Sequence, residues 1–150
     1  MKKTILIILC GVMVLGLTGC GKSKNELDIG SKSNIKISQN DVTMTIKEGT
    51  LTNKSATLVL TNNSDKNFEY GTPYEIEVKK DGEWHKINVE LDFNMPAFQL
   101  SAKESNEIEL DWEYGYGRLA EGTYRIIKGI DYEYEEGKYE PFNVAVEFTI

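Results

Sequence analysis

The chain has 150 residues, with 17 basic and 24 acidic side chains and a single histidine, which gives a net charge of −7. This negative charge keeps a domain soluble and argues against nucleic acid or anionic lipid as the main partner. One histidine excludes a metal site with two histidine ligands and gives no support to a histidine-based catalytic triad. Length and composition therefore favour one folded domain without a recognisable catalytic set.

The chain begins with a short hydrophobic leader. Lys2 and Lys3 precede an almost wholly apolar run from Ile5 to Leu17, which is shorter than the roughly 20 residues that a membrane-spanning helix needs. A charged start and a short apolar run are typical of a secretory signal peptide rather than a transmembrane helix. We therefore expect residues 1–19 to be a signal peptide, and a membrane helix is the alternative.

The leader ends in Leu17-Thr18-Gly19-Cys20, which resembles the lipobox of bacterial lipoproteins. The resemblance implies that Cys20 becomes the new N-terminus and carries lipid, including palmitate. It also implies an anchor in the cell membrane, with the remaining chain on the extracytoplasmic face. Two or three acyl chains make a stable anchor, because each buried CH₂ contributes about 0.8 kcal/mol. Since Cys10 lies in the leader, the mature domain is expected to have no disulfide.

Residues 20–40 are rich in Ser, Lys, Asn and Gly and have no sustained apolar period. This composition is typical of a flexible linker, so we expect a lipidated N-terminus and tether. The segment Ile35–Ile37 is an alternative start for the first strand. The expected division is a signal peptide at 1–19, a tether at 20–40 and a folded domain at 41–150.

Apolar and polar residues alternate through most of the stretch from Asp41 to Ile150, which is typical of half-buried β-strands. The alternating runs lie at Val42–Ile46, Ala56–Leu60, Tyr74–Val78, Trp84–Leu91, Ile108–Trp112, Tyr124–Ile130 and Phe142–Ile150. About seven short strands with turn signals between them predict an all-β fold. The default is an immunoglobulin-like antiparallel β-sandwich.

Three local signals refine this prediction. Asp81-Gly82 supplies the residues that a two-residue hairpin turn needs, and Pro96 makes Phe93–Leu100 an edge strand or an irregular crossing. Trp84 is out of step with Ile87, which predicts a bulge or an outward Trp84.

The phrase Leu119-Ala120-Glu121-Gly122-Thr123-Tyr124-Arg125-Ile126 places a tyrosine just inside the penultimate strand. In immunoglobulin-like sandwiches such a tyrosine returns its hydroxyl to the upstream backbone, whereas a plain core aromatic is the alternative. Together with Tyr70-Gly71-x-x-Tyr74-x-Ile76-Glu77 and Asp81-Gly82-Glu83-Trp84, the phrase resembles a bacterial immunoglobulin-like domain. Such domains occur in small secreted proteins and lipoproteins of low-GC Gram-positive bacteria. The resemblance implies a sandwich and a surface location, and no catalytic residues, cofactor or ligand.

The loop expected before the last strand, Asp131–Pro141, is the candidate recognition surface. Tyr132, Tyr134 and Tyr139 alternate with charged residues there, and tyrosine offers rigid contact area at low entropic cost. Calcium ligation by its acidic oxygens is one alternative, although the spacing matches no familiar calcium loop. A bland solvated hairpin is the other alternative. A second patch of tyrosine and glycine, Glu113–Arg118, is expected at the opposite end of the sandwich.

These features predict a non-enzymatic binding or accessory module at the cell envelope. The expected partners are the membrane, through lipid on Cys20, and an unknown protein or envelope component, but not nucleic acid. We expect no cofactor and no metal, and we expect His85 to be an exposed strand residue. One alternative is a proteinase-inhibitor-like β-sandwich, which needs an exposed loop that enters a protease cleft. Another is a structural spacer or accessory subunit of an envelope complex.

The expected topology also bears on how this loop is presented. In an immunoglobulin-like order, the first strand starts at the same end as the Asp131–Pro141 loop. Without a tether, that loop is expected to face the membrane.

Overall fold

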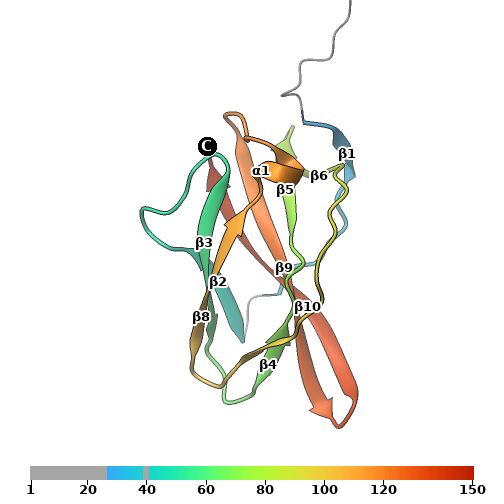
Figure 1. Cartoon of the computed structure of the whole chain (residues 1–150). Coiled ribbons are helices and arrows are strands. Elements are labelled where there is room, and N and C mark those ends of the chain that lie inside the picture. Colours follow the sequence, from blue (N-terminus) through green and yellow to red (C-terminus); the bar gives the residue numbers. More distant parts are fainter. Residues whose placement is uncertain (1–26, 39–40) are drawn as a thin grey trace, which may run out of the picture.

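The computed structural model describes residues 27–38 and 41–150 as two stacked antiparallel β-sheets (Figure 1). The elements are β1 (Ile29–Lys32), β2 (Val42–Ile46), β3 (Ser55–Asn62), β4 (Phe68–Tyr70), β5 (Glu75–Lys80), β6 (Glu83–Ile87), β7 (Phe98–Leu100), β8 (Ser105–Asp111), α1 (Glu113–Tyr116), β9 (Thr123–Glu135) and β10 (Lys138–Thr149). One sheet has the order β2–β3–β8. The other has the order β1–β6–β5–β9–β4–β7, with β10 on the free side of β9. The predicted β-sandwich is confirmed.

The core lies between the sheets and follows the predicted alternation. Val144 and Phe148 of β10 are buried, and the Phe148 ring lies 5.6 Å from the Tyr124 ring and 5.9 Å from the Trp112 ring. Burying such a side chain contributes about 1.5–3 kcal/mol, so the alternation decides which face of each strand turns inward. The Tyr124 hydroxyl donates to the Ala120 carbonyl at 3.0 Å, which confirms the tyrosine returning to upstream backbone.

The turn between β5 and β6 is the predicted two-residue hairpin turn. Asp81 and Gly82 both have positive φ, 52° and 82°, and Lys80 pairs with Glu83 across them. Trp84 lies opposite Lys79 in a regular ladder and faces away from the core, so the outward alternative is confirmed.

One expectation about strand length was wrong. The strand expected to reach Leu91 ends at Ile87, and the chain has no regular structure until β7, an edge strand that begins after Pro96. The segment between β8 and β9 contains the single helical turn α1. No helix within the described ranges is long and apolar enough to cross a bilayer.

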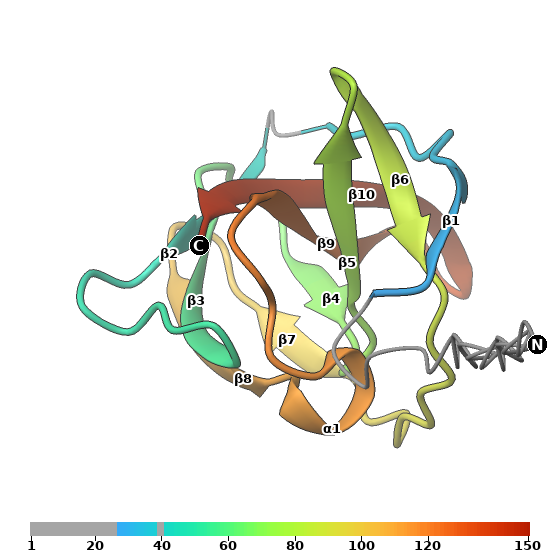
Figure 2. The ribbon, with the colours of Figure 1, turned by 90° about the horizontal axis from the view of Figure 1, so that it is seen from above.

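Residues 27–38, which make up more than half of the expected tether, pack on the domain; we call them the N-terminal strap. Its strand β1 pairs with β6, the Ser33 amide donates to the Trp84 carbonyl at 2.7 Å, and the Ser38 amide donates to the Asn143 carbonyl at 2.7 Å. The strap therefore crosses the outer face of the larger sheet from β6 to β10 (Figure 2). The expected signal peptide and Cys20 lie outside the described residues.

The strap covers an ion pair on that outer face. The Glu77 side chain is fully buried, and the Arg125 guanidinium donates to Glu77 Oε2 from Nε at 2.8 Å and from Nη2 at 2.6 Å. Ser33 of the strap lies 3.4 Å from the guanidinium, which also stacks 4.7 Å from the Trp84 ring. Residues 27–38 are thus part of the folded unit, because they exclude water from a buried charge pair.

A buried lysine holds a bulge between β4 and β5. Because Glu69 pairs with Asp131 and Glu75 pairs with Ile127, residues 70–74 lie opposite only residues 128–130. Lys128 Nζ donates to the Gly71 carbonyl at 2.6 Å and to the Pro73 carbonyl at 2.9 Å, which satisfies acceptors that the ladder leaves unpaired. Burial lowers the pKa of Lys128 to about 8.

The described chain begins at the end of the sandwich opposite the β9–β10 hairpin (Figure 1). Leu27 and Asp28 line a hollow together with Glu113–Arg118, next to α1. The expectation that the first strand starts at the hairpin end applies to β2, because Asp41 lines a hollow with Tyr132 and Glu140. It was wrong for the domain as a whole, since the strap precedes β2 and starts at the other end.

Candidate recognition surface

Residues 131–141, which we expected to form a loop, are the outer half of the β9–β10 hairpin. Strand pairing continues to Glu135 and resumes at Lys138, so only Glu136 and Gly137 lie between the paired strands. Gly137 has a φ of 72°, a conformation that glycine adopts without a steric cost, and its amide donates to Glu133 Oε1 at 2.8 Å. Lys138 Nζ pairs with Glu135 at 2.6 Å. The surface is therefore a β-ribbon with a tight turn.

The three predicted tyrosines lie on both faces of this ribbon. Tyr132 and Tyr134 share one face, with ring centroids 6.5 Å apart. Tyr139 pairs across the ladder with Glu133, the residue between them, and therefore lies on the other face. The structure brings two of the three predicted side chains together and separates the third.

The same tyrosines differ in burial. The Tyr132 ring packs 5.6 Å from the Phe68 ring, with Lys66 Nζ 4.6 Å above it, and is half-buried. Tyr134 is 56% exposed and Tyr139 is 47% exposed. Tyr132 therefore joins the ribbon to the sandwich, whereas Tyr134 and Tyr139 offer their rings to solvent.

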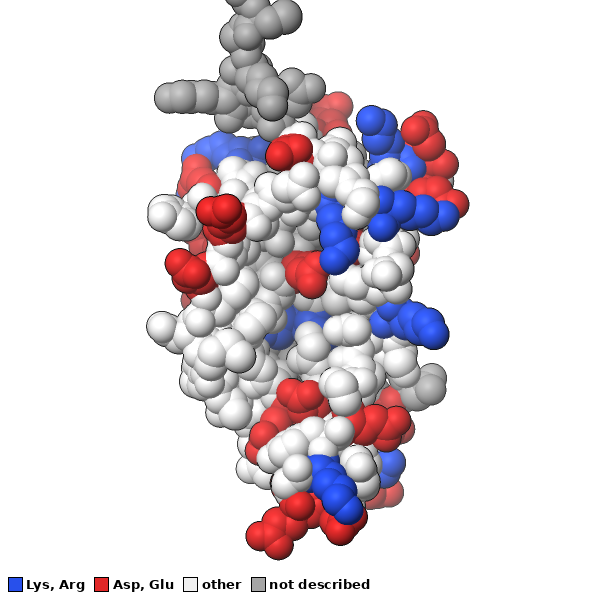
Figure 3. Space-filling model, turned by 90° about the vertical axis from the view of Figure 1, so that its right-hand side faces the viewer, with Lys and Arg blue, Asp and Glu red and all other residues white. Residues whose placement is uncertain are grey.

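The ribbon is strongly acidic. Residues 131–141 contain five carboxylates and one lysine, and acidic side chains gather around this end of the molecule in Figure 3. Glu133 raises the pKa of the Tyr139 phenol, with smaller contributions from desolvation and from the charges of Glu69 and Asp131. The negative potential around the ribbon favours a cationic partner surface and disfavours an anionic one.

Sequence reasoning missed two of the residues that support the ribbon, Phe68 and Lys66. The Phe68 ring meets Phe142 edge-on at 5.6 Å, beneath Tyr132, and Lys66 contributes the cation above the Tyr132 ring. The alternation of Phe68 and Tyr70 around Glu69 was the available signal. It was short, because β4 has only three residues.

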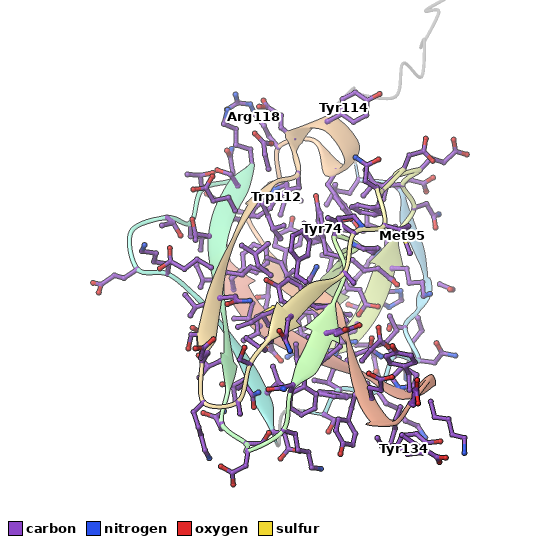
Figure 4. The ribbon with its side chains drawn as sticks, turned by 60° about the horizontal axis from the view of Figure 1, so that its bottom comes forward. Tyr74, Met95, Trp112, Tyr114, Arg118 and Tyr134 are labelled. Atoms are coloured by element: carbon purple, nitrogen blue, oxygen red, sulfur yellow. The ribbon has the colours of Figure 1, made fainter. Side chains whose placement is uncertain are left out.

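The remaining predicted candidates lie elsewhere. Tyr114, which is 99% exposed, and Arg118 are at the end opposite Tyr134, as expected for the second patch (Figure 4). His85 is half-buried rather than exposed, with Nδ1 3.3 Å from the Gly30 carbonyl oxygen. Within residues 27–38 and 41–150, no group of three or more His, Cys, Asp or Glu side chains is arranged to hold a metal ion.

Comparison with known proteins agrees with the architecture. The sequence matches the family described as bacterial Ig-like domain over residues 38–149, which covers β2 to β10. Searches of curated proteins and of solved structures found no match. The chain therefore belongs to the bacterial Ig-like domain family.

Proposed function

We propose that the chain is a lipid-anchored, extracytoplasmic binding module that contacts a cationic protein or envelope component through the outer half of the β9–β10 hairpin. The observation that carries the proposal is that the start of the strap and the hairpin ribbon lie at opposite ends of the domain. The strap begins beside α1, and the acidic ribbon with Tyr134 and Tyr139 projects from the other end. If lipid on Cys20 anchors the chain, the ribbon lies at the end of the domain opposite the start of the strap.

The chemistry of the ribbon supports a protein partner with basic side chains. The exposed rings of Tyr134 and Tyr139 supply amphipathic contact area with few rotatable bonds. The surrounding carboxylates attract lysine and arginine and accelerate encounter at low ionic strength. Because the tyrosines lie on two faces of the ribbon, a partner that uses both of them has to grip the ribbon from both sides.

The anchor is tested separately from the binding surface. Cys20→Ala is expected to move the protein from the membrane fraction to the soluble or secreted fraction, because it removes the site of acylation. Retention of the variant in membranes after a high-salt wash contradicts the anchor.

The binding surface is tested by capture from intact cells with a Tyr134→Ser/Tyr139→Ser variant. Tyr114→Ser is the matched control, because it removes an even more exposed tyrosine at the other end of the domain. We expect the hairpin variant to capture less of a partner that the control retains. Raising the salt concentration is expected to reduce the capture further, because salt screens the attraction between exposed charges. Equal capture by both variants contradicts the hairpin proposal and favours a structural spacer.

A further inference from the structure

A second surface lies on the open side of the sandwich, away from the outer half of the hairpin. A groove of about 450 Å³ runs between β8 of the smaller sheet and the β4–β5 bulge of the larger one, within the range typical of ligand pockets. Its apolar walls consist mainly of aromatic rings and of the inward side chains of β8. These residues are Tyr70, Tyr74, Phe93, Phe98, Ile108 and Leu110.

The bulge held by Lys128 shapes this groove. It interrupts the pairing between β9 and the β4–β5 segment at residues 70–74, so Tyr70 and Tyr74 both line the opening. The Tyr70 ring stacks on Phe98 at 5.4 Å, and the Tyr74 ring meets Phe93 edge-on at 5.5 Å. Figure 4 shows Tyr74 among the side chains between the sheets. Aromatic pairs on one side therefore face β8 on the other.

The groove has polar contacts at both ends. At one end the Asn106 side-chain amide donates to the Tyr70 hydroxyl at 3.1 Å and to the Gln99 carbonyl at 2.9 Å. At the other end the Tyr74 hydroxyl lies 3.5 Å from the Asp111 carbonyl oxygen. Burial, ahead of the charges of Tyr116 and Asp111, raises the pKa of Tyr74 to about 12, so this phenol remains a neutral donor. The stretch of β8 between these contacts borders the groove.

The backbone of that stretch has unpaired hydrogen-bonding groups. The Trp112 amide donates to the Lys54 carbonyl and the Asn62 amide donates to the Glu104 carbonyl, both at 2.9 Å. Because antiparallel ladders alternate, Ile108 and Leu110 also direct their backbone groups toward β3, whereas Glu107 and Glu109 direct theirs toward the open edge. Among the described strands, none pairs with this edge of β8.

The charges on the same edge select the occupant. Glu107 and Glu109 are exposed on the outer face of the sheet. Glu107 forms an ion pair with Lys47 at 2.8 Å, whereas no described residue forms an ion pair with Glu109. An added strand places a side chain about 5 Å from Glu109, where a basic residue is favoured and an acidic one is not. A second copy that paired through its own β8 edge would bring like charges together. The edge therefore disfavours self-association and favours a basic strand.

We propose that β8 and the adjoining aromatic groove bind an extended peptide segment of a partner protein by β-strand addition, with basic residues opposite Glu107 and Glu109 and apolar residues between them. The backbone groups of Glu107 and Glu109 provide the ladder, and the alternating side chains enter the groove. This binding mode does not depend on the proposed role of the hairpin, because the two surfaces share no residue.

The test uses the full-length chain in non-ionic detergent and a blocked seven-residue peptide that alternates lysine with valine. We expect the peptide to slow hydrogen exchange of the Glu107 and Glu109 amides by about tenfold or more, and to leave the Ile108 amide, already directed at β3, unchanged. A peptide of the same composition with contiguous lysines is expected to bind at least about tenfold more weakly, because it cannot place alternate side chains on the two faces.

Charge reversal separates this site from general attraction to an acidic protein. Glu109→Lys is expected to lower the affinity for the lysine–valine peptide by about tenfold and to allow a glutamate–valine peptide to bind. Glu121→Lys, which makes the same change of net charge at an exposed position before β9 and outside both proposed surfaces, is expected to leave affinity within about twofold. The proposal is overturned if both variants weaken binding equally, if the contiguous peptide binds as well, or if protection appears on the hairpin. If hydrogen exchange of the Glu109 amide slows with rising protein concentration when no peptide is present, the proposal is overturned and self-association is favoured.

Discussion

Arg125 and Glu77 lie 48 residues apart and form a buried ion pair, in which Nη2 is 2.6 Å from Oε2, beneath the N-terminal strap. Oε1 of Glu77 is the only buried side-chain oxygen or nitrogen among the described residues without a hydrogen-bond partner. Every bond of the guanidinium to Glu77 therefore falls on one oxygen. The pair joins β5 to β9 under the strap, so packing of residues 27–38 and the stability of the larger sheet depend on each other.

Removing one member of this pair is expected to be far more harmful than removing both. Arg125→Met leaves a buried carboxylate without its counter-charge, which we expect to lower the free energy of unfolding by about 3–5 kcal/mol. The Glu77→Leu/Arg125→Met double variant is expected to regain most of that loss. Urea unfolding of the parent, the two single variants Glu77→Leu and Arg125→Met, and the double variant measures the coupling. A double variant that loses the sum of both single losses contradicts this account.

Lys128 predicts a distinctive dependence of stability on pH. Its pKa falls from 10.5 to about 8 in the folded protein, so between these values the unfolded chain binds more protons than the folded chain. The Lys128 contribution to stability therefore increases as pH rises from about 8 to 10.5, by at most about 3 kcal/mol at 1.36 kcal/mol per unit.

Comparison with Lys128→Met isolates this contribution. The buried tyrosines titrate in both proteins, so their effects on stability cancel in the difference. We expect the stability of the parent minus that of the variant, measured by urea unfolding, to increase over this pH range. At pH 7 the variant is expected to be less stable by about 1–3 kcal/mol, since the Gly71 and Pro73 carbonyls lose their donor. A difference that is constant or that decreases with pH contradicts the buried, charged lysine.

Tyr132 and Tyr134 are expected to differ in their effects on stability. Tyr132 packs between Phe68 and Lys66, so Tyr132→Ser is expected to cost about 1–3 kcal/mol. Tyr134→Ser removes an exposed ring and is expected to change stability by less than about 0.5 kcal/mol. Thermal unfolding of the two variants measures both effects. Equal losses contradict the assignment of Tyr132 to support and Tyr134 to contact.

The sandwich was predictable wherever the alternation was long. The run from Phe142 to Ile150 specifies which face of β10 is buried, and Gly122 and Tyr124 specify the turn and the returning hydroxyl. β1 was not predictable in the same way, because its residues show no alternation and are mostly exposed. It forms because β6 offers an edge and because the strap covers a charge pair whose members are far apart in the sequence.

The candidate surfaces were predictable only in part. The tyrosines between Asp131 and Pro141 marked the hairpin, but the strand pairing that separates Tyr139 from Tyr134 depends on the turn at Gly137. The groove depends on Lys128. The alternation predicts that Lys128 points inward between Ile126 and Ile130. The two carbonyl groups that accept its hydrogen bonds, however, belong to a bulge that only the tertiary strand pairing creates.

The central claim, that the outer half of the hairpin is the contact surface, is tested most directly by site-specific photo-crosslinking in intact cells. A photoreactive residue placed at position 134 samples the hairpin, and the same residue at position 114 samples the opposite end. We predict one discrete adduct with a basic protein or envelope component from position 134, weakened by salt and absent from position 114. The same adducts from both positions, or an adduct from position 114 alone, would contradict the account.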